Sequence, residues 1–414
     1  MTARLNPLAW QKNNIFTAFM IAELINQFHS PLYIYSESSI IANINKLKQS
    51  IIYPKVMFCY AMKANSNISI LKTIRDQQIG IDCVSQGEIL LALKAGFDPA
   101  RIRFTPTFAS RSEIAFAISR GIQLSIDSMP FVHWLLDEFP GLPIGLRMNP
   151  SVMAGAYLKT STGHSKAKFG IGMNQVPVLL DLIKNQGLRI NGLHIHSGSD
   201  ILELQQFMDA VEVLLEVAPL FKTLEYIDLG SGFKVSYFEG DKETDMEALG
   251  KMISTRMTQF CRLYGKELKL IFEPGKFVVS NAGQFIVTCT GVKENGGITF
   301  AGVDSGFNHL IRPMFYGAFH TIKNISNPEG SLKTYDIVGN ICETDTFASD
   351  RLIPEIREGD FLSFENAGAY CFSMSSSYNT RPRPAEVYIR TNGKAELIRR
   401  RETLDDILSA QMNL

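Results

Sequence analysis

The chain lacks an excess of charge of either sign, because its 414 residues carry 41 Lys and Arg against 41 Asp and Glu. Such a protein has no overall field that attracts nucleic acid or an anionic membrane, so neither is predicted as a partner. Long hydrophobic runs are also absent: no uncharged apolar stretch reaches the roughly 18 residues of a membrane span. The apolar segment 16–25 contains Glu23 and lacks a small-residue cleavage pattern. We therefore expect a soluble, cytoplasmic protein.

Cysteine is scarce, and no C-x-x-C pair occurs among the six residues, which stand at positions 59, 83, 261, 289, 342 and 371. Because they lie within or beside apolar runs, the sequence predicts neither a disulfide framework nor a zinc site, and a reducing compartment fits best. What the chain does have is 45% hydrophobic and 20% charged residues. This is ordinary globular composition, with enough length for two domains.

Short apolar runs alternate with longer helical patterns between residues 30 and 275. Eight such runs with intervening helices favour a (β/α)8 TIM barrel over an open doubly wound sheet. The runs are 56–61, 80–84, 101–105, 123–126, 143–147, 190–195, 226–229 and 268–272.

Strand-like segments separated by Gly, Pro and Asn follow residue 283, and they predict a second, mostly β domain with a sandwich-like or barrel-like sheet. The segments are 285–292, 298–303, 335–341, 361–364 and 385–389. We expect the barrel to span residues 33–282, and residues 1–32 and 283–414 to form the β domain.

Polar residues cluster at the carboxyl ends of the predicted barrel strands. In a TIM barrel these ends converge on one mouth, so residues far apart in sequence form one site. The residues are Lys63, Asp82, Ser85, Thr105, Asp127, Asn149, His196, the turn Gly230-Ser231-Gly232 and Glu273.

Lys63 directly follows the run 56–61, in the segment YAMKAN. An amine at the end of a buried strand is desolvated, which favours the neutral, nucleophilic form that makes a Schiff base with an aldehyde. This indicates an enzyme that uses pyridoxal 5'-phosphate (PLP). The alternative is a solvated lysine at a strand end, which is the commoner case for a lysine that stands alone.

Two turns at the predicted barrel mouth suit the phosphate and the pyridine nitrogen of PLP. In Gly230-Ser231-Gly232, small residues let backbone N–H groups turn toward a phosphate, although the same residues also make an ordinary tight turn. Glu273, in the run Glu-Pro-Gly, would place a carboxylate opposite a pyridine nitrogen and keep that nitrogen protonated. A solvated glutamate before a turn is the alternative.

His194 and His196 stand two residues apart, so both face the same side of the sixth strand. No third ligand stands at a matching spacing, so we predict no metal site and expect one imidazole to stack on a flat cofactor. For His194 a packed core histidine remains an alternative. Cys342-Glu343 follows a strand-like run, and taken by itself this thiol fits inert packing.

Motifs run in order from about residue 30 to about residue 390. They are YAMKAN at 60–65, DCVSQGE at 82–88, STGHSKAKFGI at 161–171, HIHSGS at 194–199, DLGSGF at 228–233, EPGK at 273–276, IRPMFY at 311–316, CET at 342–344, NAGAY at 366–370 and FSMSSSYNTRPRPAEV at 372–387. In these motifs the chain resembles the diaminopimelate decarboxylase family. The resemblance implies the fold type III, alanine racemase-like class of PLP enzymes, with a barrel, a β domain and a head-to-tail homodimer.

The resemblance also implies a role for each matching residue. Lys63 would hold PLP, His196 would stack on its ring, and Glu273 would pair with the pyridine nitrogen. Further cofactor-binding positions are Asp82, Ser199, Gly230, Ser231, Gly232, Gly275, Lys276 and Tyr370. The distal end of the substrate would contact Lys276, Arg312, Tyr316, Glu343 and Tyr370, under a lid at 161–168. Cys342 would enter from the other subunit as the acid that protonates the carbanion, so a monomer should be inactive.

The implied reaction is PLP-dependent decarboxylation of meso-2,6-diaminopimelate to L-lysine and carbon dioxide, the last step of lysine biosynthesis. Glu273 favours decarboxylation, because racemases of this fold place an arginine at the pyridine nitrogen. Three departures leave the substrate open. Lys276 replaces the family's usual arginine and cannot make a planar bidentate pair with a carboxylate. Ser231 stands at the centre of the glycine triplet, and Asp345 adds a charge near the substrate's distal end.

Two alternatives follow from these departures. Lys276 and Asp345 favour a related decarboxylase that acts on another amino acid or an amino acid conjugate, for example in a siderophore or secondary metabolite pathway. A non-catalytic regulator with the same fold is the second alternative, and the retention of Lys63, Glu273 and Cys342 argues against it.

Overall fold

The structure is a computed structural model, and it describes residues 16–152 and 167–411. The chain divides into two compact units, one of residues 41–278 and one of residues 1–40 with 279–414.

The unit of residues 41–278 contains a closed barrel of eight parallel strands, and β10 pairs with β2 to close it. All eight predicted strands are confirmed, to within two residues at each end. The barrel strands are, in order, β2 (Val56–Ala61), β3 (Gly80–Cys83), β4 (Ile102–Phe104), β5 (Gln123–Ile126), β6 (Pro143–Asn149), β8 (Arg189–His194), β9 (Tyr226–Asp228) and β10 (Lys269–Phe272). A short strand, β7 (Ile171–Gly172), pairs with β6 outside this circle.

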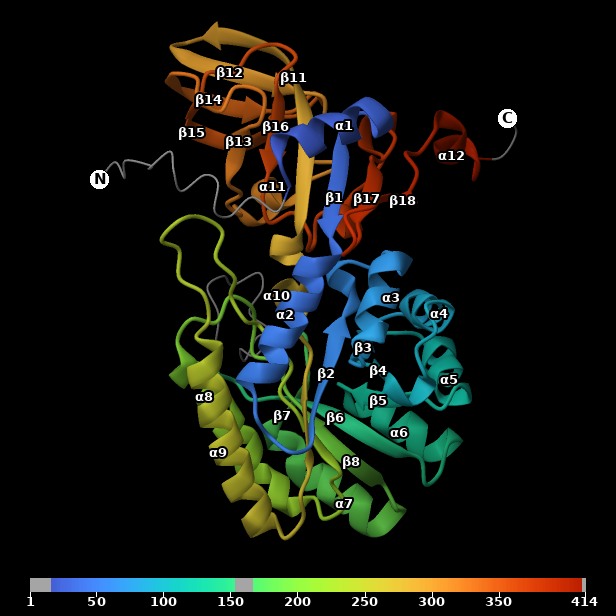
Figure 1. Cartoon of the computed structure of the whole chain (residues 1–414). Coiled ribbons are helices and arrows are strands. Elements are labelled where there is room, and N and C mark those ends of the chain that lie inside the picture. The colour runs from blue at the N-terminus through green and yellow to red at the C-terminus, as the bar shows by residue number, and fades with distance from the viewer. Residues whose placement is uncertain (1–15, 153–166, 412–414) are drawn as a thin grey trace. The chain divides into compact units, whose positions relative to one another are not determined.

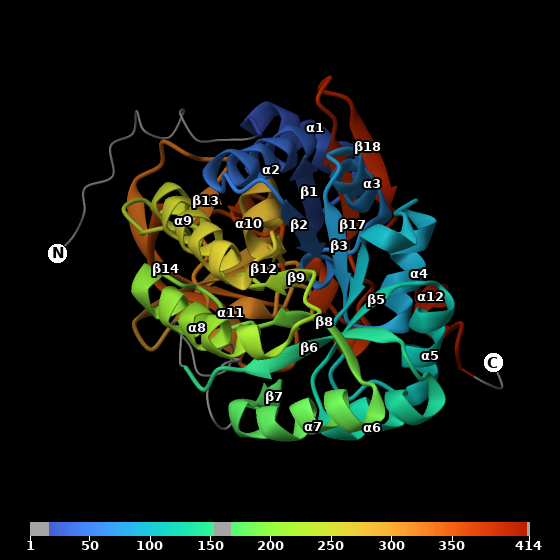
Figure 2. The same ribbon diagram turned by 90° about the horizontal axis from the view of Figure 1, so that it is seen from below.

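Helices alternate with the strands and surround the barrel, as Figures 1 and 2 show. Because the helices cover the outside and side chains fill the inside, strands such as β3 and β9 are buried at every residue, Asp82 and Asp228 included. The helices are α3 (Ile68–Asp76), α4 (Gln86–Lys94), α5 (Arg111–Ser119), α6 (Met129–Glu138), α7 (Val176–Gln186), α8 (Leu204–Val217) and α9 (Met246–Tyr264). Helices α2 (Glu37–Ser50) and α10 (Lys276–Val279) stand where the chain passes between the two units.

Short polar residues begin several of these helices. Ser85 precedes α4 and its Oγ accepts the backbone N–H of Glu88, while Ser110 and Glu113 form a capping box at α5. Such caps satisfy N–H groups that the first turn leaves without partners. The strand-end residue Ser85 is therefore a helix cap.

The second unit is built on a mixed sheet of nine strands, which confirms the prediction of a mostly β region after residue 283. The pairing order is β15-β14-β12-β11-β1-β17-β18, and β16 pairs with β11 and β13. The strands are β1 (Leu32–Ser36), β11 (Gly283–Asn295), β12 (Ile298–Val303), β13 (Ile322–Asn324), β14 (Leu332–Val338), β15 (Thr346–Pro354), β16 (Phe361–Phe364), β17 (Ala385–Ile389) and β18 (Ala395–Arg399). Helices α1 (Ala18–Phe28), α11 (Arg312–Tyr316) and α12 (Leu404–Leu408) belong to the same unit.

Strand β1 was not predicted from the sequence. It pairs antiparallel with β11 and parallel with β17, so the N-terminal segment completes a sheet made mainly by the C-terminal third of the chain. Apolar residues of α1, such as Ile21 and Leu24, pack with β1 in one buried cluster.

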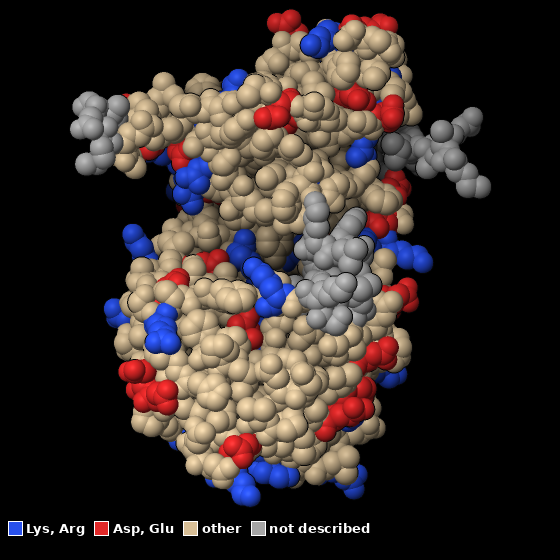
Figure 3. Space-filling model, turned by 180° about the vertical axis from the view of Figure 1, so that it is seen from behind, with Lys and Arg blue, Asp and Glu red and all other residues tan. Residues whose placement is uncertain are grey.

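Among the described residues, no helix has both the length and the apolar character that crossing a bilayer requires. On the face drawn in Figure 3, basic and acidic side chains are interspersed, as the equal numbers of the two charges lead one to expect.

Candidate active site

Three predicted strand-end residues meet where β2, β3 and β4 end. Lys63, in the short 3-10 helix Met62–Ala64 that follows β2, has its Nζ 3.3 Å from Asp82 Oδ2. Thr105 Oγ1 donates to Asp82 Oδ1 over 2.5 Å. Asp82 is buried, and burial together with the nearby charge of Glu273 raises its pKa to about 6. The side chain of Lys63 is 42% exposed, so its amine can be reached from solvent.

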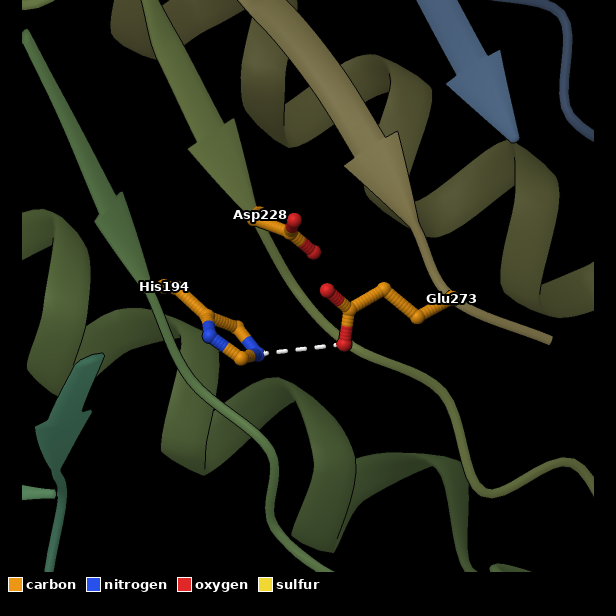
Figure 4. A group of neighbouring side chains, drawn as sticks. All are labelled: His194, Asp228 and Glu273. Carbon is orange, nitrogen blue, oxygen red and sulfur yellow. Dashed lines mark ion pairs between the residues drawn. The ribbon is translucent and has the colours of Figure 1, made fainter. Parts of the chain in front are cut away.

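A second group lies where β8, β9 and β10 end, as Figure 4 shows. It consists of His194, Asp228 and Glu273, and one polar side-chain atom of each lies within 4.8 Å of the other two. His194 Nε2 is 3.3 Å from Glu273 Oε2. All three residues are buried, with Glu273 the most exposed at 8%. Three parallel strands thus bring together residues that are up to 79 positions apart, since 273 minus 194 is 79.

Arg103 of β4 supplies the balancing charge inside the barrel. Its Nε lies 3.2 Å from Asp228 Oδ2, and its guanidinium lies over the ring of Tyr226, 4.1 Å from the centroid. Gly192 makes room for that ring, because a Cβ there would lie 2.0 Å from Tyr226 Cζ. Aromatic and carboxylate groups replace the water that an arginine loses on burial, and they offset the cost of burying its charge.

The surroundings drive the pKa values of the two neighbouring carboxyls apart. Burial would raise the pKa of Glu273, but His194 and Lys63 outweigh burial and hold that pKa below its usual range. Burial and then the charge of Glu273 raise the pKa of Asp228 instead. Two like charges this close cannot both ionise freely, so the negative charge resides on Glu273.

Glu273 therefore offers a buried negative charge, and its Oε1 has no hydrogen-bond partner among the described residues. Leaving a buried polar atom without a hydrogen bond costs free energy unless a bound ligand supplies the missing partner. A protonated pyridine nitrogen would do so, and the residues at this end of the barrel consequently fit PLP.

The spacing of His194, Asp228 and Glu273 would also admit a metal ion. Both oxygens of Asp228 already have partners, however, since Arg103 lies beside Oδ2 and the N–H of Gly230 donates to Oδ1 over 3.0 Å. A metal ion needs several available ligand atoms, whereas a pyridine N–H needs one acceptor, which Glu273 Oε1 can supply, so the arrangement favours the pyridine. That the chain binds no metal stays a prediction.

The turn Gly230-Ser231-Gly232 lies against the segment that follows β8. Gly230 and Gly232 have φ values of 61° and 123°, in the region that favours glycine, and a Cβ at Gly232 would lie 2.1 Å from Gly198 O. The N–H of Ser231 points to His196 Nδ1 over 3.3 Å, and the N–H of Gly232 to the serine's own Oγ over 2.5 Å. Small residues are thus required here, and Ser231 keeps the backbone donors that a third glycine would supply.

His196 is half-buried beyond the end of β8. Burial, followed by the charges of Arg147 and Lys63, lowers the pKa of His196 to about 3. A neutral imidazole stacks on a flat ring without carrying a buried charge, so the geometry suits the predicted role. Ser199 and Gly275 lie in the turns on either side of this region, after β8 and β10.

Lys276 has a partner that the sequence did not reveal. Its Nζ lies 2.6 Å from Asp200 Oδ1, with both side chains little exposed at 13% and 12%. Tyr237 lies beside the same amine, 6.0 Å from Nζ to the ring centroid. A partly buried ion pair of this kind holds the ammonium in place and neutralises it locally.

The remaining predicted residues belong to the other unit. Arg312 in α11 is buried, and its Nη1 lies 3.1 Å from His320 Nε2. Tyr316 ends the same helix, and Tyr370 has a left-handed backbone with φ 57°. Cys342 and Glu343 are exposed. The predicted lid at 161–168 lies outside the described residues except at its last two positions.

That Asp345 adds a charge near the substrate's distal end stays a prediction. The side chain is only 4% exposed, and its Oδ1 accepts the backbone N–H of Phe307 over 2.8 Å. Gly339 lies against its other oxygen, since a Cβ there would be 1.8 Å from Oδ2. Asp345 therefore joins two loops inside its unit.

The sequence pattern does not reveal that His194 is the partner of Glu273 or that Arg103 is the partner of Asp228. One signal was present: Arg103 is a charged residue within an apolar strand, and such a residue is rarely buried unless it is paired. The pairing itself depends on strands that are distant in sequence.

Comparison with known proteins agrees with this geometry. Residues 37–280 match the family model "Pyridoxal-dependent decarboxylase, pyridoxal binding domain". The chain is 38% identical over 400 residues to a diaminopimelate decarboxylase of Methanothermobacter thermautotrophicus, covering 94% of this chain and 93% of that protein. It is 35% identical to the diaminopimelate decarboxylase of Escherichia coli K12, covering 96% and 97%.

Solved structures give the same result. A crystal structure of diaminopimelate decarboxylase superposes with a TM-score of 0.90 at 32% identity, covering 97% of this chain and 98% of the other. The Helicobacter pylori diaminopimelate decarboxylase in complex with L-lysine superposes with a TM-score of 0.86 at 32% identity, covering 94% and 98%. The chain therefore belongs to the diaminopimelate decarboxylase family of PLP-dependent decarboxylases.

Proposed function

We propose that this chain decarboxylates meso-2,6-diaminopimelate to L-lysine and carbon dioxide. The observation that carries the proposal is Glu273, a buried, ionised carboxylate with one unpartnered oxygen in the same unit as Lys63. Relatives that carry the name diaminopimelate decarboxylase support the choice of substrate, and so does the L-lysine in the Helicobacter pylori structure.

In this proposal the barrel residues hold the cofactor. Lys63 would hold PLP through its amine, His196 would stack on the ring, and Glu273 would keep the pyridine nitrogen protonated. The other positions proposed to bind it are Asp82, Ser199, Gly230, Ser231, Gly232, Gly275, Lys276 and Tyr370. When bound, PLP supplies an electron sink for the pair of electrons that the departing carboxylate leaves behind.

The mostly β region, residues 1–32 and 283–414, is proposed to complete the site of a second subunit in a homodimer. Cys342 would donate the proton from Sγ to the substrate carbon that has lost its carboxylate. Arg312, Tyr316, Glu343 and Tyr370 would bind the distal amino acid end. The exposure of Cys342, the only exposed cysteine of six, supports a role at an interface. All six are free thiols, which supports a reducing, cytoplasmic location.

The test is release of carbon dioxide from purified, PLP-loaded protein given meso-diaminopimelate, L-lysine, L-ornithine or D-glutamate in parallel. The amine product is identified by mass. We expect turnover of meso-diaminopimelate alone, with lysine as the product. Cofactor loading without turnover of any of the four would contradict the proposed substrate and leave the family assignment intact.

A second candidate is decarboxylation of another amino acid or amino acid conjugate. The ion pair between Lys276 and Asp200 favours it, because an ammonium already neutralised by a carboxylate attracts a distal carboxylate less strongly than a free cation would. Turnover of an amino acid without a distal carboxylate, in preference to meso-diaminopimelate, would select this candidate.

A further inference from the structure

The surroundings of Cys342 are ordered by a single side chain. Asn379 contacts Cys342 at two points: its Oδ1 accepts the backbone N–H over 3.0 Å, and its Nδ2 donates to Sγ over 3.1 Å. The amide thus fixes both the backbone and the sulfur of the same residue. The other five cysteines are buried, so Cys342 is the one whose thiol is held at the surface.

Asn379 is itself held in an uncommon conformation. Its φ and ψ are 55° and 26°, a left-handed geometry that asparagine tolerates better than most residues. On one side of it, the ring of Tyr378 stacks on Phe307 at a centroid distance of 5.6 Å. On the other, Arg381 Nη2 donates to Asn340 O over 2.8 Å. Contacts on both sides keep the amide aimed at Cys342.

The ionisable groups around Sγ are arranged so that the amide is the close polar donor. Tyr378 OH lies farther away at 3.9 Å and donates to Glu343 Oε1 over 2.8 Å. That bond to Glu343, with a smaller contribution from Cys342, raises the pKa of Tyr378 to about 12, so the phenol stays neutral. Asp345 is buried and directed at the N–H of Phe307.

We propose that Asn379 is a positioning residue for the proton transfer from Cys342, an inference that rests on the proposed function. In this transfer the S–H bond breaks, a C–H bond forms at the carbon that has lost its carboxylate, and the electron pair stays on Sγ. The N–H of Asn379 points at the atom where this negative charge develops. A donor fixed beforehand stabilises such a charge without reorganisation.

The sharpest variant is Asn379→Asp, which has the same shape, tolerates the left-handed backbone and still accepts the N–H of Cys342. It replaces the N–H donor at Sγ with an oxygen. We expect the pH midpoint for alkylation of Cys342 by iodoacetamide to rise by about one unit, which slows labelling at neutral pH about tenfold. Labelling is followed by peptide mass spectrometry on the PLP-loaded protein without substrate.

Asn392→Asp is the matched control. Asn392 Oδ1 also accepts a backbone N–H, that of Lys394 over 3.0 Å, in an exposed turn of the same unit. This variant should label like the parent. Asn379→Gly is a second variant that keeps the left-handed backbone without a side chain, and it should also label more slowly than the parent at neutral pH.

The kinetic readout separates positioning from binding. With meso-diaminopimelate, Asn379→Asp should lower kcat about tenfold and leave KM unchanged. An unchanged labelling midpoint in both variants would overturn the inference, as would a parent protein whose Cys342 does not react, because a thiol that meets a substrate must be reachable. If the labelling midpoint shifts but the parent protein has no decarboxylase activity, the positioning of Cys342 by Asn379 is upheld and the proposed function is overturned.

Discussion

The three buried carboxylates at the ends of β3, β9 and β10 and the buried carboxylate of Asp345 are stabilised in two different ways. In the barrel unit Asp82 has Lys63, Asp228 has Arg103 and Glu273 has His194 as a basic partner at 3.2–3.3 Å. In the other unit Asp360 and Glu386 pair with arginines, but Asp345, which is also buried, has no ion pair among the described residues and accepts the backbone N–H of Phe307 instead. The first arrangement adjusts charge, whereas the second fixes a loop.

The two arrangements meet two different requirements of the proposed reaction. The barrel must keep one carboxylate ionised away from water, and for Glu273 the charges of His194 and Lys63 and the hydrogen bond with His194 do so. The loops around Cys342 must hold a thiol in one orientation, and neutral hydrogen bonds from Asn379 suffice. Substitutions should therefore alter charge-dependent chemistry in the barrel and orientation or stability in the other unit.

The largest effects are expected from the two residues proposed to react. Lys63→Ala should abolish both the visible absorption band of bound cofactor and carbon dioxide release, because no amine is left to hold the aldehyde. Cys342→Ala should keep the band and lose product formation by about 1000-fold, the scale of general acid catalysis. The control variant is Lys72→Ala, which removes the charge of an exposed lysine on α3. A normal band in Lys63→Ala would contradict the assignment.

Asp345→Asn tests the carboxylate that lacks a basic partner. Burial raises the pKa of Asp345 from 3.8 to about 6, so the folded state favours the protonated form. Its contribution to stability is therefore fully present below about pH 4 and is lost as pH rises through 6. Asparagine keeps an oxygen for Phe307 N–H without the charge. We expect the variant to raise the free energy of unfolding at pH 8 by up to about 3 kcal/mol.

Chemical denaturation at pH 8 and at pH 4 measures this effect, and the gain should disappear at pH 4. The control is Asp350→Asn, which changes an exposed aspartate of the same unit and should alter stability little at either pH. A loss of stability at pH 8 in Asp345→Asn would show that the charged form is favoured in the fold.

Glu273→Gln tests charge in the barrel. The amide has the same size but cannot keep a pyridine nitrogen protonated, so kcat should fall about 100-fold while KM changes less. Glu225→Gln, an exposed glutamate of the same unit, is the matched control and should leave kcat unchanged. If both variants retained full kcat, the buried charge would have no part in the reaction.

The smallest effect is expected at the ion pair of Lys276 with Asp200. If Lys276 substitutes for the usual arginine, Lys276→Met should raise KM for meso-diaminopimelate about tenfold with little change in kcat. Asp200→Asn should lower KM, because it leaves the ammonium free for the substrate. A double-mutant cycle measures the coupling, and an unchanged KM in both single variants would exclude this role.

The barrel could be predicted from the sequence because its strands are continuous apolar runs with polar residues at their ends. Lys63 and Glu273 were found in the same way, from their places after β2 and β10. Strand β1 was missed, because its partners β11 and β17 lie some 250 and 350 residues away and a five-residue run does not indicate them.

The pairings inside the site could not be predicted for a related reason. Period two predicts His194 and His196 on one face of a strand, but β8 ends at His194 and His196 lies beyond it. Which carboxylate lies beside His194 depends on the closure of the barrel. The burial of Asp345 was not predicted, because a charged residue near a functional motif suggests an exposed side chain, whereas packing against Gly306 and Gly339 buries it. The burial of a side chain depends on its tertiary neighbours, which a local sequence pattern does not identify.

Mixing two inactive variants tests most directly whether the two regions form one site across a dimer. Lys63→Ala and Cys342→Ala proteins are combined under conditions of subunit exchange, and carbon dioxide release from meso-diaminopimelate is measured. Random pairing into dimers should restore roughly a quarter of the parent activity, since half of the dimers then carry one intact site. No recovery despite exchange confirmed by mass spectrometry would contradict a shared site.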